Sequence, residues 1–241
     1  MGFKLLYKRF GSTSILIEWP SVINETVLQD VLNFKVKIEN WGIEKGIQMT
    51  NAYNSLVINF VDDEIDFDKQ VLELQEVYNS SNDRIKNKSK LWRVPVCYDA
   101  SFGIDLDAIS LEKNMPKDAI IKKHSQTIYT VYFIGFLPGF LYLGGLDASI
   151  SMPRKATPRL KINKGAVAIG GDQTGVYPNA SPGGWNIIGN SPINFFDVSK
   201  TEPCFAKAGD KIEFYQISLK AHYDMKTLVD ANVYVIESKS I

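Results

Sequence analysis

The sequence has few of the residues on which many enzymes and secreted proteins depend. Its 241 residues include two histidines and two cysteines, Cys97 and Cys204. The cysteines are far apart and have no CxxC spacing, which excludes a disulfide framework, and so small a set of sulfur and imidazole ligands disfavours a zinc site. We therefore expect a cytoplasmic protein with two reduced thiols and assign no metal ligands.

An excess of charge of either sign is also missing. Lysine and arginine together number 27, aspartate and glutamate number 27, and the formal net charge is zero. Nonspecific binding to nucleic acid or to anionic membranes needs a cationic excess, so we expect neither as a partner. No apolar run approaches the roughly 18 residues of a membrane-spanning helix, and the N-terminal segment lacks the layout of a signal peptide.

Two common catalytic motifs are absent from the sequence. There is no GxxxxGK[ST] loop for nucleotide phosphates, and the stretch GGDQTG is not followed by Lys-Ser/Thr or by a helical pattern. There is no GxSxG motif, which argues against the nucleophile of an α/β-hydrolase. Carboxylates remain able to bind Mg²⁺.

The first 80 residues alternate between strand and helix patterns. Two short strands are expected within residues 3–19, and Asn24 is placed to cap a helix that begins at Glu25. A strand over residues 54–61 and an amphipathic helix over 67–78 follow. This β-β-α-β-α order indicates a small N-terminal α+β domain of ferredoxin-like type.

A polar segment over residues 79–90, NSSNDRIKNKSK, is the best candidate for a linker. A basic binding patch is the alternative interpretation, but the composition favours a solvated hinge. We therefore predict two domains, residues 1–85 and residues 90–241.

The second predicted domain starts with a strand and two short helices and then becomes rich in β-structure. The strand covers residues 91–98, and the helical turns cover 104–111 and 116–124. From residue 128 to 217, short apolar runs alternate with Gly- and Pro-rich turns, which is typical of a β-barrel or sandwich. Residues 232–238, NVYVIES, are expected to supply a further strand.

Three segments of this domain combine glycine and proline with residues that stack or form hydrogen bonds. They are FIGFLPGFLYLGGL, MPRKATPR and GGDQTGVYPNASPGGW, at residues 133–146, 152–159 and 170–185. Glycine permits close backbone approach and proline stiffens a loop, so repeated use of both predicts rigid, shaped loops, on which binding residues often lie. The alternative is that a β-barrel simply needs many turns.

Arginine and histidine supply the candidate chemistry. Arg154 and Arg159 offer planar guanidinium groups suited to carboxylate or phosphate, and Lys155 and Lys161 add positive charge nearby. His124 is a candidate general base, although a histidine near a helix C-terminus also complements the helix dipole. We assign no role to His222, the other histidine.

The motifs in the second half resemble one protein family closely. VYFIGFLPGFLYLGGLD, PRKATPR, GAVAIGGDQTGVYPNASPGGWNIIGNSP and FFD follow one another in the order found in the allophanate hydrolase subunit 1 family. That family includes the B subunit of bacterial 5-oxoprolinase and the Kip-type inhibitor of a sporulation histidine kinase. The resemblance is strong over about residues 91–214.

The resemblance implies a fold, partners and a reaction. It implies a C-terminal cyclophilin-like β-barrel after the α+β domain, a C-type barrel partner, an A-type partner, and ATP-dependent opening of 5-oxoproline to glutamate by the three proteins together. ATP would act in the complex at an unknown site, with Mg²⁺ left open, and the chain would not be active alone. Inhibition of a sensor histidine kinase is the alternative, and carboxyl transfer in urea breakdown is a third, less favoured reading.

The same resemblance selects the site residues. The catalytic candidates are His124, Arg154 and Arg159. The candidates for binding a small-molecule substrate are Gln173, Tyr177, Trp185, Phe136 and Phe140. We expect all of them to meet in one recess with an aromatic wall, shaped also by Tyr142, and a cationic wall.

Overall fold

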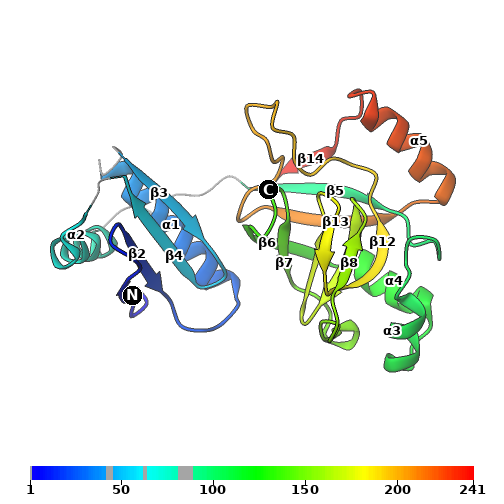
Figure 1. Cartoon of the computed structure of the whole chain (residues 1–241), viewed down its shortest axis with the longest axis horizontal. Coiled ribbons are helices and arrows are strands. Elements are labelled where there is room, and N and C mark those ends of the chain that lie inside the picture. Colours follow the sequence, from blue (N-terminus) through cyan, green and yellow to red (C-terminus); the bar gives the residue numbers. More distant parts are fainter. Residues whose placement is uncertain (1, 42–45, 62–63, 81–88) are drawn as a thin grey trace. The chain divides into compact units, whose positions relative to one another are not determined.

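The chain divides into two compact units in the computed structural model, which describes residues 2–41, 46–61, 64–80 and 89–241. The units are residues 1–87 and residues 88–241, each with a core of its own (Figure 1). The boundary falls within the segment predicted as a linker, most of which, residues 81–88, lies outside the described residues.

The first unit is a four-stranded antiparallel sheet with two helices (Figure 1). The strands have the order β1-β2-β4-β3. The elements are β1 (Leu6–Arg9), β2 (Ser14–Glu18), α1 (Glu25–Asn40), β3 (Ile47–Asn51), β4 (Ser55–Phe60) and α2 (Phe67–Asn79). The chain order is therefore β-β-α-β-β-α, with β3 missed by the sequence pattern. A ferredoxin-like unit runs β-α-β-β-α-β, so that part of the prediction is not confirmed, whereas the α+β character is.

The helices of this unit form where the sequence predicts them. The side chain of Asn24 accepts a hydrogen bond of 2.9 Å from the backbone N–H of Val27 at the start of α1, and Asp66 accepts one from Lys69 at the start of α2. One face of α1 is buried, at Val27, Leu28, Val31, Leu32, Phe34 and Ile38. Each large apolar side chain so buried contributes roughly 1.5–3 kcal/mol, which outweighs the small helix propensities of valine and isoleucine.

The second unit is built around an eight-stranded sheet in which β5 and β13 are the parallel pair. The sheet order is β12-β9-β10-β7-β6-β13-β5-β14, and β8 and β11 form a separate two-stranded sheet. The strands are β5 (Lys90–Val96), β6 (Ile128–Ile134), β7 (Leu141–Gly144), β8 (Arg159–Ile162), β9 (Ala166–Gly170), β10 (Gln173–Val176), β11 (Ser181–Gly183), β12 (Asn186–Asn190), β13 (Lys211–Gln216) and β14 (Glu237–Ser240). The late strand predicted over residues 232–238 is wrong in its first part, because pairing with β5 begins only at Glu237.

This sheet curls without forming a continuous closed ladder among the described residues. Beyond the end of β5, Cys97 pairs with Asn190 at the end of β12 through backbone hydrogen bonds of 2.8 and 2.9 Å. That isolated bridge brings the first strand of the order back to the region of β5. The structure thus shows a mixed α/β fold with several sheets, and the specific cyclophilin-like barrel is not confirmed.

Helices α3 (Leu106–Lys113) and α4 (Lys117–Ser125) pack against one another, and α5 (Leu219–Asp230) precedes β14 (Figure 1). The predicted helical turns before β6 are confirmed, with Pro116 immediately before α4. A 3-10 turn over Ala148–Ile150 follows β7. In the described part of the chain, every helix is too short or too polar to cross a membrane.

Candidate functional site

A pocket of about 280 Å³ lies in the second unit, where the three Gly- and Pro-rich segments meet. It is lined by Phe136, Phe140, Tyr142, Arg154, Lys155, Pro158, Tyr177, Pro182, Gly183, Gly184 and Trp185. The first three residues come from the β6–β7 connection and β7, the next three from the segment before β8, and the others from the segment between β10 and β12. Five of the eight predicted site residues line this pocket.

Phe140 is the centre of the aromatic wall. It is fully buried, and its ring makes edge-on contacts with Phe136, Tyr177 and Trp185 at centroid separations of 5.6, 5.3 and 5.5 Å. Contacts of this geometry contribute about 0.5–1.5 kcal/mol each beyond the burial of area. The segment FIGFLPGFLYLGGL therefore runs from a core strand into a rigid loop that supplies one wall of the pocket.

Two backbone features shape this loop. Phe136 has a φ of 64°, a left-handed conformation that is uncommon for a residue with a side chain, and its ring is 61% exposed at the pocket. Gly139 has a φ of 85°, and a Cβ there would lie 2.8 Å from the carbonyl oxygen of Phe195. Glycine is therefore required at 139, and the tight approach to Phe195 fixes the loop against the rest of the unit.

The cationic wall is supplied by Arg154 and Lys155. The guanidinium of Arg154 lies over the indole ring of Trp185, 5.7 Å from its centroid. Among the described residues Arg154 has no acidic partner. An exposed guanidinium stacked on an aromatic face keeps its fork of donors available for a carboxylate or phosphate.

Tyr177 joins the two walls. Burial raises the pKa of its hydroxyl, although the hydrogen bond from the backbone N–H of Trp185 and the charge of Arg154 act in the opposite direction. Its hydroxyl also lies where a Cβ of residue 183 would be, at 2.4 Å, so Gly183 leaves the hydroxyl its place beside the pocket. The phenol is therefore neutral at physiological pH and acts as a hydrogen-bonding and packing group.

Arg159 does not line the pocket, because its guanidinium is engaged by Asp105. Its Nη1 and Nη2 donate to the two carboxylate oxygens at 2.9 and 2.7 Å. Lys155 Nζ forms an ion pair with the same carboxylate at 2.9 Å, and the backbone N–H of Ile187 donates to it at 2.7 Å. Burial would raise the pKa of the Asp105 carboxyl, but these donors outweigh it and the pKa is lowered. The prediction that Arg159 holds a substrate anion gains no support from this geometry.

His124 lies in the core of the unit rather than at the pocket. It has no exposed surface and stacks on Phe214 with a centroid separation of 4.8 Å. Its Nδ1 is 2.7 Å from Tyr98 Oη and its Nε2 is 2.8 Å from Thr174 Oγ1. Since the Thr174 hydroxyl donates to the carbonyl of Ala168, Nε2 is the donor to Thr174 and Nδ1 accepts from Tyr98.

Burial lowers the pKa of His124 to about 3. The ring is therefore neutral at physiological pH, with both nitrogens occupied by buried hydroxyl groups. A catalytic role stays a prediction, but the placement that the sequence led us to expect, beside the arginines, is not what the structure shows. The interpretation from the helix dipole also fails to describe this residue, because a neutral ring carries no charge to complement the dipole.

Gln173 also lies outside the pocket lining. It is half-buried at the start of β10, where it pairs with Gly170 across the β9–β10 hairpin. Its Oε1 atom is buried without a hydrogen-bond partner among the described residues. The GGDQTG stretch is thus the turn of a hairpin, and no helix follows it to bind phosphate groups.

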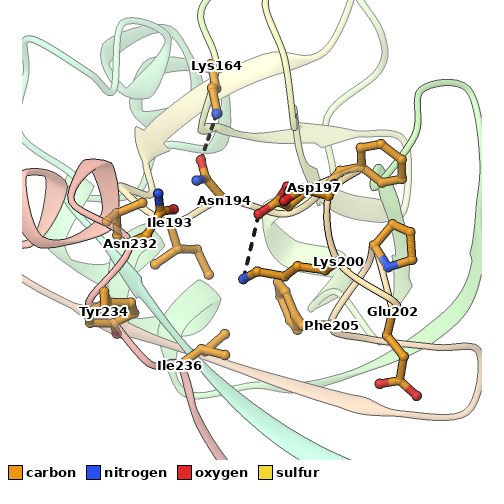
Figure 2. Close-up of a pocket in the computed structure, with 14 residues that line it drawn as sticks. Lys164, Ile193, Asn194, Asp197, Lys200, Glu202, Phe205, Asn232, Tyr234 and Ile236 are labelled. Atoms are coloured by element: carbon orange, nitrogen blue, oxygen red, sulfur yellow. Dashed lines mark hydrogen bonds and ion pairs between the residues drawn. The ribbon is translucent and has the colours of Figure 1, made fainter.

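A second recess of about 580 Å³ lies between the segment after β12 and the segment after α5 (Figure 2). Its polar groups bind one another: Lys164 Nζ donates to Asn194 Oδ1 at 2.7 Å, and Lys200 Nζ lies 3.9 Å from Asp197 Oδ2. Its other lining residues include Ile193, Phe205, Val229, Tyr234 and Ile236. None of the predicted site residues lies here, and its two cations face two acids, Asp197 and Glu202.

In the parts of the chain that the structure describes, no group of three His, Cys, Asp or Glu side chains is placed to hold a metal ion. Both thiols are free: Cys97 is buried, and burial raises the pKa of each thiol. The functional surface of this unit is therefore the aromatic and cationic pocket, which suits a small, flat anion.

Comparison with protein families decides the relationship. The family described as carboxyltransferase domain, subdomain C and D, matches residues 5–206. The chain belongs to this family. The resemblance to the group formed by allophanate hydrolase subunit 1 and the 5-oxoprolinase B subunit, inferred from the motifs, is thereby confirmed.

Curated members of the carboxyltransferase subdomain C and D family carry one name, that of the 5-oxoprolinase B subunit. The protein of this name from Bacillus subtilis (strain 168) is 31% identical over 94% of this chain and 98% of its own length. That of Haemophilus influenzae is 37% identical over 70% of this chain and 78% of its own length. That of Escherichia coli O157:H7 is 39% identical over 55% of this chain and 61% of its own length.

Solved structures of similar fold are often larger than this chain. TTHA0988 has a TM-score of 0.73 and 26% identity, and the match covers 85% of this chain and 40% of TTHA0988. The conserved uncharacterized protein PH0987 from Pyrococcus horikoshii has a TM-score of 0.54 and 34% identity over 90% of this chain and all of PH0987. The urea amidolyase of K. lactis shares the fold, with a TM-score of 0.84 at 19% identity over 100% of this chain and 16% of that protein.

Asp105 is the residue of this site that sequence reasoning missed. It lies immediately before α3, where an aspartate normally caps a helix. In the structure it makes no side-chain cap, because its carboxylate is directed to Arg159, 54 positions along the chain. The sequence holds no signal for a pair that only the tertiary fold brings together.

Proposed function

We propose that this chain is the B subunit of an ATP-dependent 5-oxoprolinase, which helps to open 5-oxoproline to glutamate. The observation that carries the proposal is the match to the B. subtilis protein of that name over nearly the whole of both chains. The alternative, inhibition of a histidine kinase, is not favoured, because the three curated relatives are all named as oxoprolinase subunits.

The pocket supports a ligand of this chemistry. 5-Oxoproline is a small, flat lactam with one carboxylate. In the proposed complex, Arg154 binds the carboxylate through charge-assisted hydrogen bonds, and the lactam ring packs against Phe140, Tyr142 and Trp185. Tyr177 and Lys155 are placed to orient the polar groups of the ligand. A pocket of about 280 Å³ excludes much larger substrates.

The reaction needs an activator, because resonance stabilises the amide of a lactam. ATP supplies that activation in the proposed enzyme, together with Mg²⁺. The residues of this chain do not fit a nucleotide triphosphate: there is no phosphate-binding loop in the sequence, and the one GGDQTG stretch is a hairpin turn. We therefore place ATP in another part of the complex and assign this chain the binding and orientation of the lactam.

The partners follow from the name of the relatives. A subunit called B implies other subunits, and we propose that a C-type barrel protein and an A-type protein are the partners of this chain. We keep a cyclophilin-like origin of the curled sheet in the second unit as part of the same proposal. The isolated chain is expected to bind the ligand without turning it over.

The test is reconstitution of the complex. The chain is co-expressed with the products of its neighbouring genes, and ATP-dependent release of glutamate from 5-oxoproline is measured with and without this chain. We expect release only when the chain and its partners are all present. Equal release from the partners alone would overturn the proposal.

A further inference from the structure

Asp105 occupies an unusual position for an ionised group. Its side chain is 5% exposed, yet it faces two cations, Lys155 and Arg159. Carboxylates are rarely buried without partners, and this one is saturated by four donors from three residues: two from Arg159, one from Lys155 and the backbone N–H of Ile187. The arrangement is a built ion-pair cluster directly behind the pocket wall.

The two cations bracket the segment that carries Arg154. Lys155 follows Arg154 directly, and Arg159 is the first residue of β8. The segment is also attached by its backbone, since the N–H of Lys155 donates to the carbonyl of Gly184 at 2.7 Å, and Met152 pairs with Gly171 at its start. Asp105 is thus the side chain that ties both ends of residues 155–159 to the body of the unit.

We propose that Asp105 is a positioning residue for the pocket: its buried carboxylate holds Lys155 and Arg159 so that Arg154 stays against Trp185 and faces the ligand. Asp105 does not line the pocket and touches no ligand there. It acts through the geometry of the segment, and this part of the mechanism rests on the proposed function for its effect on substrate binding.

The charge balance gives the proposal a further consequence. Asp105 neutralises one of the two cations that it contacts, while Arg154 has no acidic partner in the described part of the chain. Loss of the Asp105 charge would leave Lys155 and Arg159 to repel one another and Arg154. The segment would then move away from the pocket, and Arg154 would lose the position that binding requires.

The test compares Asp105→Asn with the wild-type chain in two measurements. Asparagine keeps the size of the side chain but loses its charge. The first measurement is the rate of tryptic cleavage of the full chain after Arg154 and Lys155, followed by mass spectrometry. The second is kcat and KM for 5-oxoproline in the assembled complex. We expect cleavage at these sites and KM each to rise at least 10-fold, with kcat changed less than threefold.

Matched variants keep the outcome decisive. Asp107→Asn removes an exposed aspartate of α3 that pairs only with Lys117, and it should alter neither measurement. Asp105→Glu keeps the charge and should restore both values toward those of the wild-type chain. If Asp105→Asn does not fold, Arg159→Lys breaks the two-point contact while keeping the charge, and it should raise cleavage in the same way.

The outcomes separate this inference from the proposed function. Cleavage and KM both within twofold of wild type in the folded variant would overturn the positioning role. If the wild-type complex releases no glutamate, the proposed function fails, and the cleavage measurement on the free chain still decides the role of Asp105. A fall in kcat with unchanged KM and unchanged cleavage would also contradict the inference.

Discussion

His124 illustrates at the scale of one residue how burial overrides the chemistry that a sequence suggests. A lone histidine before a glycine-rich segment is a reasonable candidate for a general base. In the fold it is neutral, saturated by Tyr98 and Thr174, and stacked on Phe214. Its contribution is to the stability of the core, and that contribution depends on pH.

The pKa of His124 predicts the direction of this dependence. The folded pKa of about 3 lies below the value of 6.5 in the unfolded chain. The unfolded state therefore binds an extra proton below pH 6.5, so stability is fully present above pH 6.5 and is lost as pH falls, by about 1.4 kcal/mol per pH unit. Between pH 7 and pH 5, the wild-type chain should lose about 2 kcal/mol more than His124→Gln in urea unfolding. Equal losses would contradict the assigned burial.

The aromatic residues show the opposite outcome at the same scale. Phe136, Phe140, Tyr177 and Trp185 were selected with the motifs and all line the pocket. Their role could be anticipated because bulky apolar residues in stiff loops must pack against something nearby. Arg159 and Asp105 could not be sorted into their roles, because an ion pair between distant positions depends on the tertiary fold.

The loop between β6 and β7 is the element on which the pocket depends most. Its course is fixed by Gly139, whose Cα hydrogens face the backbone of Phe195, and by the left-handed conformation of Phe136. Regular elements were easier to predict than such connections. The amphipathic helices followed from spacing, whereas β3, with the sequence IQMTN, carries too few branched or aromatic residues to be recognised.

A comparison of two glycines tests the account of the loop. Gly139→Ala places a Cβ against the Phe195 carbonyl and also strains a positive φ, so we expect a loss of about 2–4 kcal/mol in the free energy of unfolding. Gly171→Ala strains a φ of 65° with no atom within 4 Å, so its loss should be about 1 kcal/mol. The measurement is urea unfolding of both variants. Equal losses would show that the close approach at residue 139 is unimportant.

At the scale of the whole molecule, the chain has separate cores in its two units. The core of the first unit includes Ile15, Phe34 and Leu56, and those of the second include Val94, Tyr129 and Phe140. The polar composition of residues 79–90 indicated the break, but the topology of each unit could not be obtained from composition. The order of elements was close in the first unit, and the curled sheet of the second replaced the closed barrel that the pattern suggested.

Separate cores predict that the second unit folds by itself. A chain of residues 89–241 retains the whole eight-stranded sheet, including the pairing of β14 with β5. We expect this fragment to unfold cooperatively on heating and to show the near-ultraviolet circular dichroism of packed aromatic residues. A fragment without a cooperative transition would show that the second unit needs the first one to fold.

The central claim is that Arg154 binds the carboxylate of 5-oxoproline in the pocket. The most direct measurement is KM for 5-oxoproline in the reconstituted complex carrying Arg154→Met, with Lys220→Met on the exposed face of α5 as the control for lost positive charge. Loss of a charge-assisted hydrogen bond of about 1.5–3 kcal/mol predicts a KM about 10- to 150-fold higher for Arg154→Met, and an unchanged KM for the control. An Arg154→Met complex with the KM of the wild type would contradict the account.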